Sequence, residues 1–173
     1  MQSWIIIVCV VAVILIFLER IVSKKRLNKR SDNIKKAVFN LPYETKPDFF
    51  TKNEYIFYNE LVTVLEGHAI IFAKVSLKDI FSIPKGTTDY KVFWNKISQK
   101  HVDFLLCDIN TLNPICGIEL DDTSHEIEKV KIRDAFVESV YKKAQLPLIR
   151  YKVKKCYTYE EIAEPLSNVI SLA

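Results

Sequence analysis

Glycine is scarce in this chain, with 3 residues among 173, and the three lie far apart. Loops that cradle phosphates through backbone N–H groups need several closely spaced glycines. A phosphate-binding loop of that kind is therefore excluded. Hydrophobic residues make up 49% of the chain and are spread along it. This content is enough for a hydrophobic core and argues against disorder.

Cysteine is also sparse, and no two cysteines are spaced as C-x-x-C. Structural zinc sites usually use such pairs, so a zinc site is not expected. Two of the four cysteines fall in apolar segments that we predict to be strands, where a free thiol acts as a small core residue. The four are Cys9, Cys107, Cys116 and Cys156.

Charge is missing from the first eighteen residues, "MQSWIIIVCVVAVILIFL", which are apolar on every side. The run is close to the ~20 residues that a membrane-spanning helix needs. The next residues, "ERIVSKKRLNKR", are basic and should stay in the cytoplasm. The pattern predicts a single-pass anchor over residues 1–22 in the cell inner membrane, with the C-terminal domain cytoplasmic. A cleaved signal peptide is the alternative, although a basic start and a small-residue cleavage site are both missing.

The net charge of +4 is unevenly distributed. Residues 19–36 hold eight basic and two acidic side chains, whereas residues 37–173 hold 17 basic and 19 acidic ones. The basic excess therefore lies beside the predicted anchor, where anionic lipid head groups are its expected partner. The rest of the chain has no overall nucleic-acid signature, so binding of nucleic acid would need a local basic patch. The candidates for that patch are Lys129, Lys131, Arg133, Lys142 and Lys143.

The chain divides into three parts in this interpretation. Residues 1–22 are the anchor, residues 23–47 are a basic linker with two prolines that favour an extended backbone, and residues 48–173 are the domain. Hydrophobic periodicity and turn residues predict the domain's elements. They are a helix over 49–67, a strand over 69–77, a short helix over 78–83, a loop over 84–99, strands over 101–108 and 115–121, a helix over 124–144, a strand over 146–153 and a helix over 158–172.

The order α-β-β-β-α-β-α predicts a three-layer α/β domain. Its first helix should begin with a capping box made by Thr51 and Glu54, and Gly67 should end it. The apolar stripe of this helix is Phe57, Leu61, Val64 and Leu65.

Carboxylates gather in the segment "HVDFLLCDINTLNPICGIELDDTSHEIEKVKIRDAF", residues 101–136. Asp103, Glu119 and Asp121 interrupt strands that are otherwise apolar. Residues two apart share a strand face, and a short turn makes antiparallel neighbours, so Asp103 should lie beside Glu119. Carboxylates crowded together repel, and a hard cation removes the repulsion. The three residues therefore predict a site for Mg²⁺, or Mn²⁺ in its place.

These residues carry a resemblance to a known superfamily. "DF" on one strand, "IELDDTSH" on the next, "RD" on the following helix and the later "LPLIR" strand resemble the restriction-endonuclease-like PD-(D/E)XK superfamily. The similarity covers about residues 48–155. It is greatest to the very-short-patch-repair endonuclease-like branch and to a bacterial family of uncharacterised domains whose first helix also bears T-x-x-E.

The resemblance implies a role for each matching residue. Asp103 and Glu119 would be metal ligands, with Asp121 beside them, and Glu54 would be the helix acid near the site. His125 would be the general base or would orient water, with Asp134 as its partner. The superfamily's usual lysine, two residues after the glutamate, is Asp121 here. The very-short-patch-like branch also lacks that lysine and uses a nearby histidine.

Several of these residues have a structural alternative. Asp121 or Asp122 would cap the next helix, with Thr123 and Glu126 forming a capping box. Asp134 falls in the apolar stripe of its helix and needs a partner, either Arg133 or His125. Lys74 would replace the missing lysine as a positive charge. His101 and His68 are more simply structural or surface residues.

Three functions follow from this interpretation. The first is a membrane-tethered, Mg²⁺-dependent nuclease that hydrolyses phosphodiesters. The second is a non-catalytic module on the same fold that binds nucleic acid or a protein partner. The third, a structural protein without a ligand, is disfavoured because a purely structural core would not keep buried carboxylates together.

Overall fold

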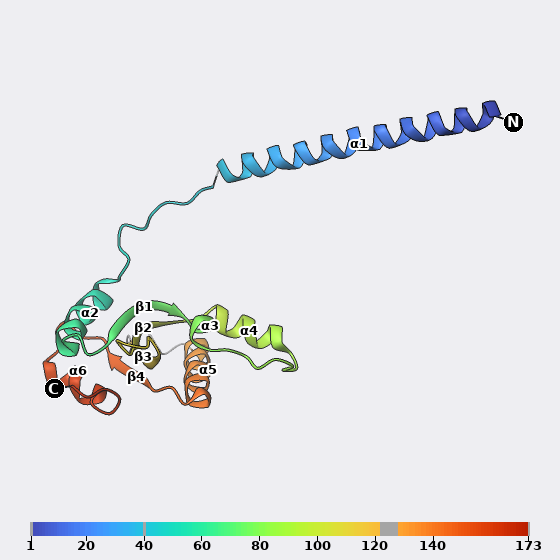
Figure 1. The fold of residues 1–173 in the computed structure, drawn as a ribbon. Helices are drawn as coiled ribbons and strands as arrows, with labels where there is room; N and C mark the ends of the chain where they lie inside the picture. The colour runs from blue at the N-terminus through green and yellow to red at the C-terminus, as the bar shows by residue number, and fades with distance from the viewer. Residues whose placement is uncertain (1, 40, 122–127, 173) are drawn as a thin grey trace. The chain divides into compact units, whose positions relative to one another are not determined.

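The computed structural model describes residues 2–39, 41–121 and 128–172, and it describes side chains for residues 14–36, 41–121 and 132–172. The chain forms two compact units, Met1–Pro47 and Asp48–Ala173. The first unit contains one long helix, α1 (Gln2–Phe39), followed by a segment without regular secondary structure. The second unit contains all the other helices and strands of the described residues (Figure 1).

Helix α1 continues well past the predicted anchor, through residues for which the sequence predicts a linker. Its C-terminal half is rich in Lys and Arg, which favour helices, and the first proline is Pro42. The described side chains of α1 are exposed. Among the described residues, we find no helix that combines the length and the apolar character required to cross a bilayer.

The second unit is built on a four-stranded sheet in the order β1-β2-β3-β4. Its strands are β1 (Ile70–Ser76), β2 (His101–Cys107), β3 (Pro114–Asp121) and β4 (Leu148–Lys152). The first three strands are antiparallel neighbours, as the short turn after β2 predicts, and β4 runs parallel to β3. Helix α5 (Glu128–Ala144) makes the crossover between the two parallel strands, as a parallel connection requires.

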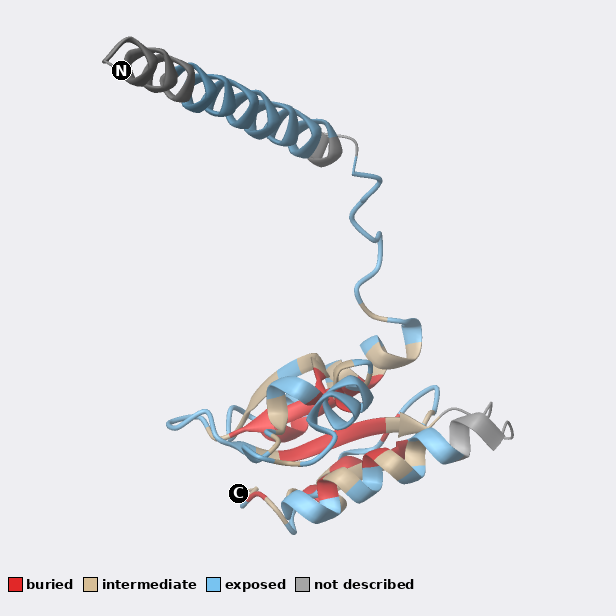
Figure 2. Ribbon diagram, turned by 90° about the vertical axis from the view of Figure 1, so that its right-hand side faces the viewer, coloured by how far each residue is buried: buried red, intermediate tan, exposed pale blue. Residues whose placement is uncertain are grey.

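Helices cover both faces of the sheet and give two cores. Helices α2 (Lys52–Leu65) and α6 (Tyr159–Leu166) pack with Phe104 and Ile118 on one face. Helices α3 (Leu77–Ile80), α4 (Tyr90–Ser98) and α5 contribute to the core on the other face, which contains Tyr141. Figure 2 shows the buried residues concentrated in the sheet and on the inner sides of the helices. The predicted mixed α/β class is thus confirmed.

Helix α2 confirms the predicted start and stripe. Thr51 accepts a hydrogen bond from the Glu54 N–H, and the Glu54 carboxylate accepts one from the Thr51 N–H, which completes the capping box. The four stripe residues are the buried residues of the helix. The end differs by one residue, because Glu66 already adopts the left-handed conformation with φ 46° before Gly67 at φ 87°.

Helix α4 corrects the prediction of a loop over residues 84–99. The helix buries only Ile97, and its N-cap residue Asp89 makes no side-chain hydrogen bond with it. Its sequence is rich in aromatic and β-branched residues, which are weak helix formers. The helix therefore forms through packing of its C-terminal end, which local sequence signals do not reveal. The predicted caps Asp122, Thr123 and Glu126 lie outside the described residues.

Candidate functional site

Four charged residues occupy one row of the sheet register, one on each strand. Ala73 pairs with Phe104 and Val75 with Val102, so Lys74 on β1 lies opposite Asp103 on β2. Phe104 pairs with Ile118 on β3. Because the two strands are antiparallel, Asp103 lies opposite Glu119. Glu119 in turn pairs with Arg150 on β4. The row reads positive, negative, negative, positive, and we call these four residues the charged row.

The centre of the charged row is the acid pair, Asp103 and Glu119. Asp103 Oδ2 accepts a hydrogen bond from the backbone N–H of Leu120, at 2.8 Å, which ties β2 to β3 beside the pair. Glu119 is only 6% exposed. Burial raises the pKa of both carboxyls, and their mutual repulsion raises the pKa of Glu119 further. The predicted juxtaposition of the two carboxylates is therefore present.

Arg150 holds the end of β3 by contacting two of its carboxylates. Its Nη1 donates to Asp121 Oδ1 at 2.6 Å, and its Nη2 lies 3.0 Å from Glu119 Oε2. These carboxylates raise the pKa of Arg150 despite burial, so the guanidinium stays charged. The contacts confirm that Glu119 and Asp121 share a face. They also leave Glu119 Oε1 buried without a hydrogen-bond partner among the described residues.

Helix α5 covers the acid pair with charged and polar groups of its own. Arg133 Nε lies 3.4 Å from Asp134 Oδ1, so Arg133 is one partner of this largely buried carboxylate. The positive charge of Arg133 lowers the pKa of Asp103 and of Glu119, while Asp134 raises that of Glu119. Glu119 also helps to raise the pKa of Tyr141, mainly an effect of burial.

Glu54 and Lys74 make an ion pair at the edge of the site. The Lys74 ammonium lies 2.6 and 2.7 Å from the two carboxylate oxygens of Glu54. Burial raises the pKa of Glu54, but its hydrogen bonds from Lys74 and Thr51 outweigh this and lower it overall. Glu54 raises and Lys74 lowers the pKa of Asp103, so both lie within electrostatic reach of the acid pair. Glu54 therefore caps its helix and also borders the site.

Lys74 reaches this position through an unusual backbone. Its φ is 53°, a left-handed conformation that is uncommon for a residue with a side chain and rarer still inside a strand. A hollow of about 330 Å³ opens beside it, lined by Lys74, His101, Val102 and Asp103. His101 is exposed at this opening. The hollow gives solvent access to the Asp103 end of the acid pair.

The predicted three-carboxylate metal group does not form. Among the residues that the structure describes, no three His, Cys, Asp or Glu side chains lie together as a metal site. Asp121 is directed to Arg150, because the arginine bridges both acids of the β3 end. His125, the predicted general base, lies outside the described residues. The structure thus unites Asp103 and Glu119 and adds Asp134 through α5.

Arg150 is the important residue that our sequence analysis missed. An arginine in the otherwise apolar strand "LPLIR" was the available signal, since a buried charge requires a charged partner. The sequence does not reveal which carboxylate that partner is, because the pairing depends on the parallel register between β3 and β4.

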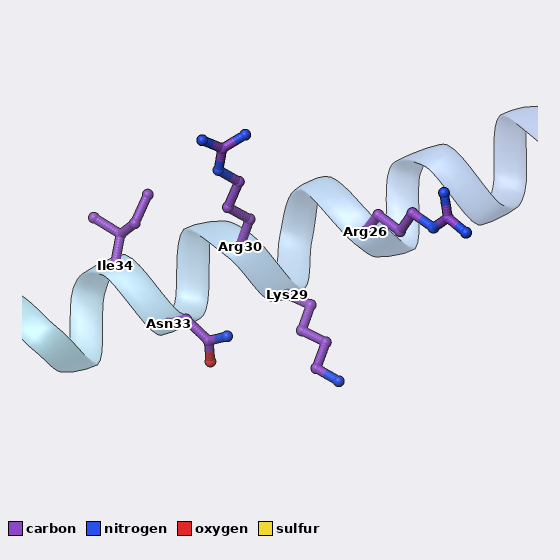
Figure 3. A pocket seen from close by; sticks show the side chains of 5 residues that line it. All are labelled: Arg26, Lys29, Arg30, Asn33 and Ile34. Atoms are coloured by element: carbon purple, nitrogen blue, oxygen red, sulfur yellow. The ribbon is translucent and has the colours of Figure 1, made fainter.

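Helix α1 carries a separate basic face. Figure 3 shows the side chains of Arg26, Lys29, Arg30, Asn33 and Ile34 pointing away from the helix. They form an exposed surface on a single helix. This surface belongs to the basic segment, residues 19–36.

The family of the chain follows from its second unit. A family model described as "Protein of unknown function (DUF2726)" matches residues 46–170, which include every residue of the charged row. The chain belongs to the DUF2726 family. No curated protein and no solved structure matches this DUF2726 chain.

Proposed function

We propose that residues 48–173 form a nuclease-like domain that hydrolyses nucleic-acid phosphodiesters with Mg²⁺, or with Mn²⁺ in its place. One observation carries the proposal: Asp103 and Glu119 lie opposite each other on neighbouring strands, and Glu119 Oε1 has no hydrogen-bond partner among the described residues. A buried carboxylate and a half-buried one beside it destabilise each other. A hard divalent cation between them offsets that repulsion and satisfies the unpaired oxygen.

The donor set fits Mg²⁺, which is usually held by one or two carboxylates together with water and substrate phosphate. Asp103 and Glu119 supply two carboxylates, so a third ligand from Asp121 is not needed. When bound, the ion would stabilise negative charge on the phosphate. The Asp103 end of the pair opens to the hollow beside Lys74, which leaves access for a substrate.

The other residues of the site position charge around the acid pair. Arg150 fixes the orientation of Glu119 by binding Oε2 and leaving Oε1 free to take a ligand. Lys74 and Arg133 supply positive charge within electrostatic reach of Asp103, which favours an anionic phosphate. In this proposal His125 takes the proton from the attacking water, and Asp134 orients His125. Both roles rest on the sequence resemblance alone.

We propose that the domain is related to the PD-(D/E)XK superfamily, as the sequence resemblance implies. An acidic residue on each of two adjacent strands, a preceding helix acid at Glu54 and flanking helices are what the resemblance implies. The missing lysine after Glu119 remains a departure. Lys74 lies in the same row as Glu119, two strands away, and its ammonium is the candidate replacement.

A cleavage assay tests the proposal. The full chain in detergent should cleave a labelled oligonucleotide when Mg²⁺ is present, and Glu119→Gln should remove cleavage, with circular dichroism used to check that this variant is still folded. Glu138→Gln, which changes an exposed acid on α5, is the matched control and should cleave as wild type does. Equal cleavage by Glu119→Gln and wild type would contradict the site assignment.

A binding module without catalysis is the second candidate function. It is favoured by the contacts of Arg150, which neutralise Glu119 and Asp121 without any bound ion. Such a module would bind nucleic acid without cleaving it, and its affinity would fall steeply as salt rises. Binding that does not change with salt would indicate a protein partner.

We further propose that residues 1–22 anchor this domain in the cell inner membrane, with residues 48–173 in the cytoplasm. The uncharged run at the N-terminus supports the anchor. The exposed basic face of α1 supports contact with anionic lipid head groups.

A further inference from the structure

Helix α4 exposes aromatic side chains that the core does not use. Tyr90, Phe93 and Trp94 are 43%, 44% and 37% exposed, respectively. The rings of Tyr90 and Trp94 are stacked, with centroids 6.2 Å apart and planes at 11°. Large apolar side chains grouped on the outside of a helix indicate a surface that binds a partner.

Lysines alternate with these rings. Residues 84–100 contain four lysines and one acidic residue, Asp89, a local charge of +3. Residues 48–173 as a whole contain 16 basic and 18 acidic residues, a net charge of −2. Positive charge is therefore concentrated around α4, which makes this surface complementary to a polyanion. The four lysines are Lys85, Lys91, Lys96 and Lys100.

The exposed aromatic residues of α4 and the four lysines together form what we call the α4 surface. This surface extends toward the acid pair. The Nζ atoms of Lys96 and Lys100 lie 5.9 and 4.8 Å from the ring centroid of Phe136 on α5. Phe136 follows Arg133 by three residues on the same helix, and Arg133 acts electrostatically on Asp103 and Glu119. Helix α4 and β2 are also consecutive in the chain, and Figure 1 shows α4 beyond the end of the sheet where β1 meets α3.

An apolar cavity of about 540 Å³ continues the surface inward between the segment after α3, helix α4 and helix α5. Phe93 and Phe136 contribute aromatic walls, and Lys143 lies at its border. A cavity of this size and lining accepts a flat aromatic group.

We propose that the α4 surface binds single-stranded nucleic acid, with bases stacked on Tyr90 and Trp94 and with the lysines holding the phosphates. This inference rests on the proposed function and names the single strand as its substrate class. Bases in a single strand have free faces that stack on aromatic side chains, whereas bases in a duplex already stack on one another. Aromatic and basic side chains also suit a lipid surface. The continuity of α4 with Arg133 and the acid pair favours nucleic acid.

Fluorescence and anisotropy test the proposal on the full chain in detergent micelles. The chain has two tryptophans, so Trp4→Phe leaves Trp94 as the sole reporter. Adding oligothymidylate in the presence of EDTA, which prevents cation-dependent cleavage, should quench Trp94. In the same buffer, Trp94→Ala should weaken the binding of labelled oligothymidylate by about tenfold, and Trp94→Phe should restore most of the affinity.

Tyr159→Ala is the matched control, because Tyr159 is 45% exposed on α6, away from α4 in Figure 1. It should bind as wild type does. Lys91→Gln is a second variant, and it should reduce the salt dependence of binding by about one ion. Circular dichroism should show that each variant keeps the wild-type fold.

Two results would overturn the proposal. One is equal affinity of Trp94→Ala and Tyr159→Ala for the oligonucleotide. The other is a shift of Trp94 emission when phosphatidylserine is added to the micelles, with no change on adding oligothymidylate, which would assign the surface to lipid. Because binding is measured without divalent cations, oligonucleotide binding with no cleavage would contradict only the proposed catalysis. Conversely, cleavage by wild type together with either of these two results would contradict only the proposal for the α4 surface.

Discussion

At the scale of single residues, Arg150 is the group on which the buried charges most depend. It compensates Glu119, whose side chain is 7% exposed, and its own side chain is 26% exposed. Removing one member of a buried ion pair leaves the other uncompensated, which is strongly destabilising. We expect Arg150→Gln to lower the free energy of unfolding by about 2 kcal/mol. This is less than the roughly 3–5 kcal/mol typical of a broken buried ion pair, because the Arg150 side chain is partly exposed to solvent. Chemical denaturation measures this change.

Arg150→Lys should recover part of that loss, since it keeps the charge but not the two-pronged contact. The exposed ion pair of Lys154 with Glu161 provides the control, and Lys154→Gln should change stability little. Similar losses for Arg150→Gln and Lys154→Gln would show that burial does not strengthen the Arg150 contacts.

Asp103 should give the domain a measurable pH dependence. The pKa of Asp103 is raised above 3.8, mainly because the carboxyl is partly buried. The folded state therefore binds the carboxyl proton more tightly than the unfolded state does. The stability that Asp103 contributes to the wild type should therefore fall as the pH rises from about 3.8 through the folded-state pKa. Asp103→Asn lacks this titration. Its stability relative to wild type should rise over the same window, as measured by urea denaturation at several pH values.

A stability difference between Asp103→Asn and wild type that stays constant from acid to neutral pH would contradict the raised pKa. Asn is the appropriate replacement because its side-chain oxygen can still accept the hydrogen bond from the Leu120 N–H.

Sequence reasoning at this scale succeeded where a short turn fixed the geometry. The turn between β2 and β3 made them antiparallel neighbours, which brought Asp103 beside Glu119. It did not succeed for Asp121 and Arg150, because their contact depends on how β4 aligns with β3 after a long crossover. The role of His125 stays a prediction.

At the scale of elements, the packing of β3 against α5 depends on Gly117. A Cβ atom at this position would lie 2.5 Å from the Tyr141 hydroxyl oxygen and 2.7 Å from two ring carbons. Tyr141 is 1% exposed and cannot withdraw easily. Gly117→Ala should therefore destabilise the domain by about 1–3 kcal/mol, as overpacked cores do. Thermal or chemical unfolding measures the loss.

The Tyr141 hydroxyl offers a matched second variant, since it is buried without a hydrogen-bond partner among the described residues. Tyr141→Phe alone should be close to neutral, because no hydrogen bond is lost. Combined with Gly117→Ala it should recover part of the stability, since the nearest clashing atom is gone. Additive effects of the two substitutions would contradict direct contact between these positions.

Elements with strong local signals were predicted well. The capping box at Thr51 and the apolar stripe of α2 identify that helix from the sequence alone. Helix α4 was missed because its exposed side is as aromatic as a core, so periodicity does not separate inside from outside. The exposed aromatic residues that obscure the helical pattern of α4 are also the residues on which its proposed binding function depends.

At the scale of the whole molecule, the proposed anchor predicts firm attachment to membranes. A positive charge in a membrane-spanning run costs roughly 2.5–3.5 kcal/mol. Ile14→Arg, in the apolar run, should therefore move much of the chain out of the membrane fraction after an alkaline carbonate wash. Ile34→Arg alters an exposed residue of the same helix beyond that run and should leave the chain in the membrane fraction. Release of wild type by the wash would contradict the anchor.

The overall architecture follows from the alternation of elements in the sequence, but the extent of α1 does not. Pro42 and Pro47 suggested an extended linker, whereas the residues before them are good helix formers and continue the helix to Phe39. Helix propensity summed over residues 23–39 therefore predicts their structure better than their charge does.

The acid pair of Asp103 and Glu119 is the centre of this account, and a calorimetric titration of Mg²⁺ into the full chain tests it most directly. The account predicts saturable binding to wild type at neutral pH, and no binding to Glu119→Gln. Glu138→Gln, the exposed control on α5, should bind as wild type does. Binding of Mg²⁺ that is the same in Glu119→Gln and wild type would contradict the account, and so would wild type that binds no Mg²⁺ even with an oligonucleotide present.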